Sequence, residues 1–158
     1  MATLRVTWRV SLRLLGGVLR WLAIPLSAPL LLAIIDGDPM IPFLVPIVIT
    51  LIAGFGLERL QTDKEMYTRE AYLMVALSWL CVGLIGAVPF ILAGNGVLAA
   101  PINAVFESMS GITTTGATVI DDFAAHSRAI LLWRQVIQWL GGLGILVLAI
   151  SILSQLSV

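Results

Sequence analysis

The sequence is poor in charge and has almost no cysteine or histidine. Only 11% of its 158 residues are charged and 59% are hydrophobic, whereas soluble domains carry about 25% charged residues. Cys81 and His126 are each the single residue of their kind, so a disulfide within the chain and a Cys/His metal cluster are both excluded. Positive and negative residues number nine each, and no basic surface interleaved with aromatic residues indicates a nucleic-acid partner. The composition indicates an integral membrane protein.

Four apolar segments are long enough to cross a bilayer, at about 14–35, 41–57, 71–93 and 129–153. Residues 1–13 precede them with an arginine at every fourth position, which predicts an amphipathic lead-in along the membrane surface. The spans hold no nucleophile–base pair or metal set, so no enzyme is expected. The predicted fold class is all-α integral membrane, with two transmembrane helices in residues 14–60 and two in residues 61–158.

A shorter segment and a threonine-rich loop lie between the last two spans. Pro101 suits the first turn of a helix, and Gly111 follows about ten residues later, or roughly 15 Å of helix. That length enters a bilayer but cannot cross it, which predicts a re-entrant half-helix at 101–111 followed by a loop at 113–118. Non-helical backbone at membrane depth is tolerated where protein buries it or where it lines a water-filled cavity.

Two interpretations of this loop stay open. Loop carbonyls can replace the water around a dehydrated ion, and the C-terminus of a half-helix favours a cation, so the loop predicts an ion pore. Threonines and a glycine after a helix are also typical of an ordinary turn, in which the hydroxyls bond to nearby backbone.

The distribution of basic residues predicts the orientation of the spans. Arginine and lysine bias loops to the cytoplasm, and they gather in residues 1–13 and 58–70. The intervals 36–40 and 94–128 contain few cations and are expected outside. Four crossings then place both termini in the cytoplasm, and the half-helix enters from the outer face.

Two stretches carry a family resemblance. Phe-Glu-Ser-Met-Ser-Gly at 106–111, with Thr-Thr-Thr-Gly-Ala-Thr-Val at 113–119, resembles the first pore loop of the TrkH/KtrB potassium-transporter superfamily. Residues 69–79, 129–135 and 138–145 also match, closest to the TrkH branch, and the resemblance covers essentially the whole chain. It implies potassium transport through a channel-like filter in a bacterial inner membrane, with no cofactor, membrane lipid around it, and a cytosolic nucleotide-binding ring protein as regulatory partner.

The sequence departs from that family in the number of pore units. Family members carry four span–half-helix–span units around one pore, whereas this sequence has one. One alternative is a homotetramer of identical chains, and another is the front part of a longer transporter. A third is a structural membrane subunit or truncated fragment that does not conduct ions.

The resemblance also implies roles for the loop residues. The backbone carbonyls of Thr114, Thr115 and Gly116 would hold potassium, with Thr113 and Ala117 at the two ends of the filter. Gly116 has a physical reason to be glycine, because inward-facing carbonyls demand backbone angles that are open mainly to glycine.

Charged residues near the loop have a functional and a structural interpretation. Glu107, at membrane depth, is a candidate pore residue, but a hydrogen bond to the backbone behind the filter is favoured. Arg134 could act as a positive element near the ion path, but a pair with Glu107 or with an acidic loop residue is favoured. Asp121 and Asp122 would concentrate cations at the outer mouth or be merely solvated. His126 is expected to be solvated and without a role.

Small residues on two spans predict close helix contacts. Gly83 and Gly86 form a strip where another helix can approach. The run from Gly141 to Gly144 could act as a hinge, but close packing is favoured.

Overall fold

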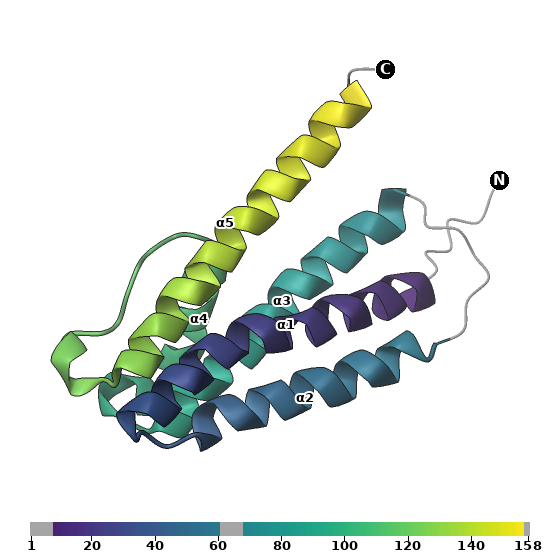
Figure 1. Cartoon of the computed structure of the whole chain (residues 1–158). Coiled ribbons are helices and arrows are strands. Elements are labelled where there is room, and N and C mark those ends of the chain that lie inside the picture. Colours follow the sequence, from purple (N-terminus) through teal and green to yellow (C-terminus); the bar gives the residue numbers. More distant parts are fainter. Residues whose placement is uncertain (1–7, 61–67, 157–158) are drawn as a thin grey trace.

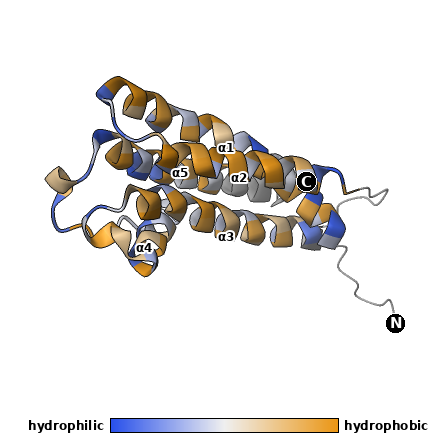
Figure 2. Ribbon diagram, turned by 90° about the horizontal axis from the view of Figure 1, so that it is seen from below, coloured by the Kyte–Doolittle hydropathy of each residue, from blue (hydrophilic) through white to orange (hydrophobic). Residues whose placement is uncertain are grey.

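The computed structural model describes residues 8–60 and 68–156. Within these ranges all regular secondary structure is helical, and there are no strands. The helices are α1 (Trp8–Asp36), α2 (Ile41–Glu58), α3 (Thr68–Ala93), η1 (Gly96–Ala99), α4 (Pro101–Ile112), η2 (Phe123–Ala125) and α5 (Arg128–Leu156). In this described part, α1, α2, α3 and α5 are long and apolar enough to cross a membrane. Hydrophilic positions concentrate at the helix ends and in the connections (Figure 2). The prediction of an all-α membrane protein with four spans is confirmed.

Part of two predicted intervals lies outside the described residues. Residues 1–7 of the amphipathic lead-in are not among them, and residues 8–13 form the first turns of α1. Residues 61–67 of the interval 58–70, where basic residues gather, are likewise outside the described residues.

The four long helices alternate in direction (Figure 1). The start of α1, the end of α2, the start of α3 and the end of α5 lie toward one end of the molecule. The connection between α1 and α2, together with α4 and both short helices, lies toward the other end. Consecutive membrane crossings require this alternation, and with four of them the start of α1 and the end of α5 lie on the same side.

Glycines let α1 and α2 approach at backbone distance. A β-carbon on Gly16 would lie 2.8 Å from the carbonyl oxygen of Gly54, and one on Gly54 would lie 2.9 Å from the backbone nitrogen of Arg20. Close approach through small residues is the usual packing between membrane helices. The guanidinium of Arg20 then reaches Glu58 on α2, with 2.9 Å between Nη1 and Oε2, so this arginine is paired.

The predicted glycine strip of α3 receives α4 and α5. Ser108 of α4 donates a hydrogen bond to the carbonyl of Gly83 at 2.7 Å, and Trp133 of α5 donates one to the carbonyl of Gly86 at 2.8 Å. A β-carbon on Gly86 would lie 2.5 Å from Cδ1 of Ile137. The expectation of a close contact here is confirmed, and it fixes α4 between α3 and α5.

Candidate ion-coordinating loop

Helix α4 ends against the middle of α5. Pro101 stands in its first turn, where the missing N–H is harmless. At its other end, a β-carbon on Gly141 would overlap the carbonyl oxygen of Ile112 and lie 2.8 Å from its carbonyl carbon. Gly141 is near the midpoint of the 29-residue α5. The close-packing interpretation of this glycine is therefore confirmed, and α4 stops about halfway along the span.

The loop after α4 folds back onto the helix end through its N–H groups. Thr114 N–H donates to the carbonyl of Gly111 at 2.9 Å, and Thr115 N–H donates to that of Ser110 at 3.0 Å. A longer contact of 3.5 Å joins the N–H of Gly116 to Ser110 as well.

The same geometry turns the loop carbonyls away from α4. No cis peptide bond occurs in the described chain, and in a trans peptide the carbonyl points opposite to the following N–H. The carbonyls of Thr113, Thr114 and Thr115 therefore point away from the helix end. None of the carbonyls from Thr113 to Gly116 accepts a hydrogen bond from the part of the chain that the structure describes.

Two loop residues have left-handed backbone conformations. Gly116 has a φ of 76°, which confirms the expected need for glycine there. Thr114 has a φ of 57°, which the sequence did not reveal, and a β-branched residue in this region is strained. The hydroxyl bonding of an ordinary turn also occurs, because Thr113 Oγ1 donates to the carbonyl of Met109 at 2.8 Å. That bond leaves the carbonyls of the loop available.

Glu107 connects α4, the end of the loop and α5. Its side chain is 1% exposed, and its Oε2 accepts hydrogen bonds at 3.0 Å from Thr118 Oγ1 and from Val119 N. Its Oε1 accepts from Nε of Arg134, whose guanidinium also stacks over the ring of Phe123. The structure thus contains both bonds expected for Glu107, one to nearby backbone and one to Arg134.

Ala117, which the resemblance places at one end of the filter, has a carbonyl that is bonded within the chain. Its carbonyl accepts a hydrogen bond of 2.6 Å from the Ser110 hydroxyl and so is turned toward α4. Asp121 and Asp122 are exposed, and Asp122 also accepts from the N–H of Ala124 at 2.9 Å, which caps η2.

The expectation that His126 is solvated is wrong. Its exposed fraction is only 8%, and its Cε1 atom lies 3.5 Å from where a β-carbon of Gly96 would stand. Gly96 has a φ of 55° and belongs to η1, so the histidine packs under a turn from another part of the chain. Nothing in the local sequence indicates that neighbour.

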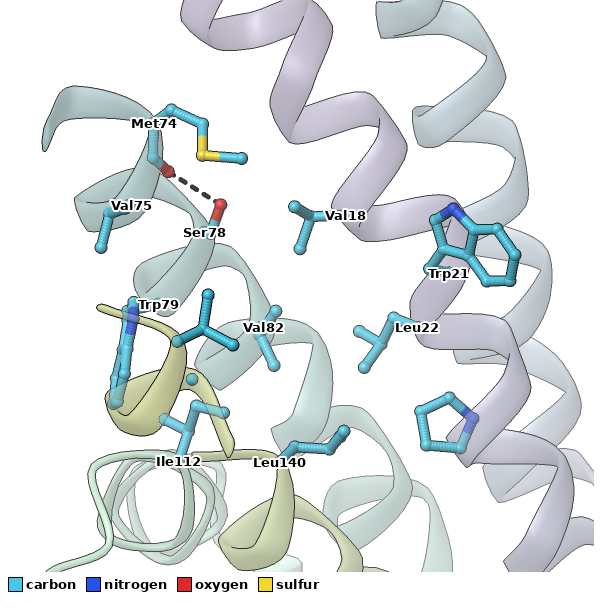
Figure 3. A pocket seen from close by; sticks show the side chains of 13 residues that line it. Val18, Trp21, Leu22, Met74, Val75, Ser78, Trp79, Val82, Ile112 and Leu140 are labelled. Carbon is cyan, nitrogen blue, oxygen red and sulfur yellow. Dashed lines mark hydrogen bonds between the residues drawn. The ribbon is translucent and has the colours of Figure 1, made fainter. Parts of the chain in front are cut away.

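A separate apolar cavity lies between α1, α3 and α5 (Figure 3), with a volume of about 490 Å³. Ile112 and Leu140 border it on one side. None of its lining residues is ionisable, and the hydroxyl of Ser78 donates to the carbonyl of Met74 at 2.8 Å. No group of three His, Cys, Asp or Glu residues that could hold a metal occurs among the described residues. The loop at 113–118 is therefore the candidate site.

Gln138 is a neighbour of the loop that sequence reasoning left without a role. A β-carbon on Gly116 would lie 3.7 Å from its Nε2. The only available signal was its spacing, because Gln138 follows Arg134 by four residues and so shares its helix face.

Comparisons with known proteins agree on one family. A family model named TrkH and described as a cation transport protein matches residues 42–157. The "Trk system potassium uptake protein TrkH" of Halomonas elongata is 43% identical over 153 residues, which cover 95% of this chain and 32% of that protein. The protein of the same name from Vibrio parahaemolyticus is 36% identical over 154 residues, covering 96% and 32%. That of Escherichia coli is 47% identical over 94 residues, covering 60% and 19%. The chain thus spans 32% of the length of the first two relatives.

Proposed function

The chain belongs to the TrkH family of cation transport proteins, and we propose that it supplies one side of a pore through which potassium crosses the membrane. The observation that carries the proposal is the loop from Thr113 to Gly116, whose N–H groups bind the end of α4 while the carbonyls of Thr113, Thr114 and Thr115 point away. Rings of such carbonyls replace the hydration shell of potassium in channel filters. The names of the relatives as potassium uptake proteins support this ion.

The loop would lie at membrane depth as part of a re-entrant segment. Helix α4 starts at the end of the molecule where α3 finishes, and it reaches Gly141 near the middle of α5. The chain then returns past Glu107, to which Thr118 and Val119 are bonded, toward η2 and the start of α5. With both termini cytoplasmic, as the basic residues predict, the segment enters from the outside.

The loop residues then divide into ligands and supports. The carbonyls of Thr113, Thr114, Thr115 and Gly116 are the potassium ligands. Glu107 is buried and bonded on both oxygens, which favours a supporting role over direct ion contact.

Acidic residues would act at the outer mouth of this pore. Asp121 and Asp122 are exposed on the connection to α5, where their charge would raise the local cation concentration.

One such loop cannot surround an ion, so three more are required. Four copies of the chain related by rotation would supply them, and so would further units of a longer chain. The two relatives of which the chain covers 32% have room for such units. Native mass spectrometry of the full gene product separates these cases, because only the first requires a four-chain species.

The test of the proposal is Gly116→Ser. A serine at a φ of 76° would be strained by about 1–3 kcal/mol, so the loop would adjust and potassium selectivity over sodium would fall. Thr113→Ser is the matched control, because it keeps both the carbonyl and the hydroxyl. Both variants of the full gene product would be expressed in potassium-uptake-deficient cells and compared at equal membrane abundance.

The outcomes of this test are distinct. Reduced growth at limiting potassium and a lower potassium-to-sodium flux ratio for Gly116→Ser alone would support the filter assignment. Parental growth and flux ratio in Gly116→Ser would reject it. No uptake by the parent protein would favour the non-conducting subunit instead.

A further inference from the structure

Gln138 occupies the space behind Gly116. A β-carbon on Gly116 would point at Nε2 of this side chain, at 3.7 Å, and would meet no other non-adjacent atom within 4 Å in the described part of the chain. That distance would be an ordinary van der Waals contact for a methyl group at this position, so the glycine itself is separated from Gln138 by about the width of a methyl group. On the side where a β-carbon of Gly116 would point, the nearest side chain of α5 is therefore that of Gln138.

The backbone of α5 holds Gln138 in place. A β-carbon on Gly111 would lie 2.7 Å from Cγ2 of Ile137 and 3.8 Å from the backbone nitrogen of Gln138. Helix α4 thus packs closely on α5 at Gly111, where Cγ2 of Ile137 fills the space that a side chain would occupy. One turn earlier, Arg134 is bonded to Glu107, and one turn later Gly141 abuts Ile112. Contacts on both sides prevent this part of α5 from retreating.

The loop also approaches α5 at Thr114, whose Cγ2 lies 3.1 Å from where a β-carbon on Gly141 would stand. The N–H groups of the loop bind the end of α4, and the carbonyls of Thr113, Thr114 and Thr115 face away from that helix. A filter discriminates between ions of different size only if its carbonyls keep their spacing or their number around the ion. A wall behind Gly116 would limit how far the loop can widen.

We propose that Gln138 is a positioning residue of the filter, whose side-chain volume keeps Gly116 from moving toward α5 and thereby maintains selectivity for potassium. This inference rests on the proposed function. Gln138 itself is not an ion ligand.

The experiment compares three variants of the full gene product. Gln138→Ala removes the wall, Gln138→Met keeps a side chain of similar length without the amide, and Gln135→Ala is a control on the same helix at an exposed position. Potassium and sodium flux would be measured in vesicles at matched protein amounts, together with the apparent KM for potassium. A purely structural role would lower the amount of folded protein and leave the flux ratio of the surviving molecules unchanged.

The expected result is a loss of selectivity in Gln138→Ala alone. Its potassium-to-sodium flux ratio should fall about fivefold, the factor to which about 1 kcal/mol corresponds, while Gln138→Met and Gln135→Ala stay near the parent. A parental ratio in Gln138→Ala, or an equal fall in Gln138→Met, would overturn the proposal. If Gln138→Ala keeps the parental ratio while Gly116→Ser alters selectivity in the same assay, only the role of Gln138 is rejected and the proposed filter stands. If the parent carries no potassium flux, the proposed function fails and this inference with it.

Discussion

Replacing Arg134 by methionine should destabilise the protein strongly, because it would leave a buried carboxylate without its counter-charge. Glu107 is 1% exposed and the Arg134 side chain is 12% exposed. After the substitution, Glu107 would keep only the two neutral donors of Thr118 and Val119. Breaking a buried ion pair from one side costs about 3–5 kcal/mol. For a chain of 158 residues, each kcal/mol lowers Tm by about 2–4 °C, so the expected fall is about 6–20 °C.

The same helix offers a matched control. Arg128 is the first residue of α5, and it pairs with Asp36 at 3.1 Å with 74% of its side chain exposed. Exposed pairs contribute about 0–1 kcal/mol, so Arg128→Met should lower Tm by at most about 4 °C. Both variants make the same chemical change in one helix. The difference between their Tm values therefore reports the effect of burying the ion pair.

The assay is thermal unfolding of the full gene product in detergent, followed by tryptophan fluorescence. Glu107→Gln combined with Arg134→Met should recover much of the lost stability, because glutamine still accepts from Thr118 and Val119 and no charge is left unpaired. A melting temperature of Arg134→Met within the range of Arg128→Met would refute the assignment of a buried pair. So would a double variant that melts no higher than Arg134→Met alone.

Three further predictions use the close contacts and the orientation of the helices. Gly141→Ala should destabilise by about 1–3 kcal/mol through overlap with Ile112, whereas Gly142→Ala, which meets nothing within 4 Å, should be neutral or stabilising in the same melting assay. Gly54→Ala should separate α1 from α2 and lower Tm, whereas Gly56→Ala, also with open space around it, should not. A cysteine at Ser127, in a Cys81→Ala background, should react with an impermeant thiol reagent added outside intact cells. Absence of labelling there would reverse the predicted orientation.

The four spans could be predicted from sequence because a bilayer imposes a simple requirement on the chain. Each crossing needs about 20 apolar residues, and every backbone group must be satisfied within its helix. Predicted spans such as 71–93 and 129–153 accordingly fall inside α3 and α5, with ends that differ by a few residues. The need for glycine at position 116 could be predicted in the same way, because glycine is the residue that tolerates a positive φ.

The residues that sequence reasoning missed depend on how helices face one another. His126 is buried because Gly96, thirty residues earlier, packs against it. Gln138 faces Gly116 because α5 is rotated to bring Arg134 toward Glu107. The strained φ of Thr114 follows from the return of the loop onto Ser110 and Gly111. Local propensity contains none of these long-range contacts.

The structure also changes the origin of the cation attraction that the sequence suggested. The negative charge of a helix C-terminus resides on its unsatisfied carbonyls, but those of Met109, Ser110 and Gly111 already accept hydrogen bonds from the loop. In the proposed pore, the carbonyls from Thr113 to Gly116, which accept no hydrogen bond from the described residues, would then supply negative potential at the site. Their direction depends on the loop staying folded against α4, and Glu107 ties Thr118 and Val119 to that position. If the loop is the proposed filter, weakening the pair of Glu107 with Arg134 should alter ion selection as well as stability, because the pair holds the loop in position.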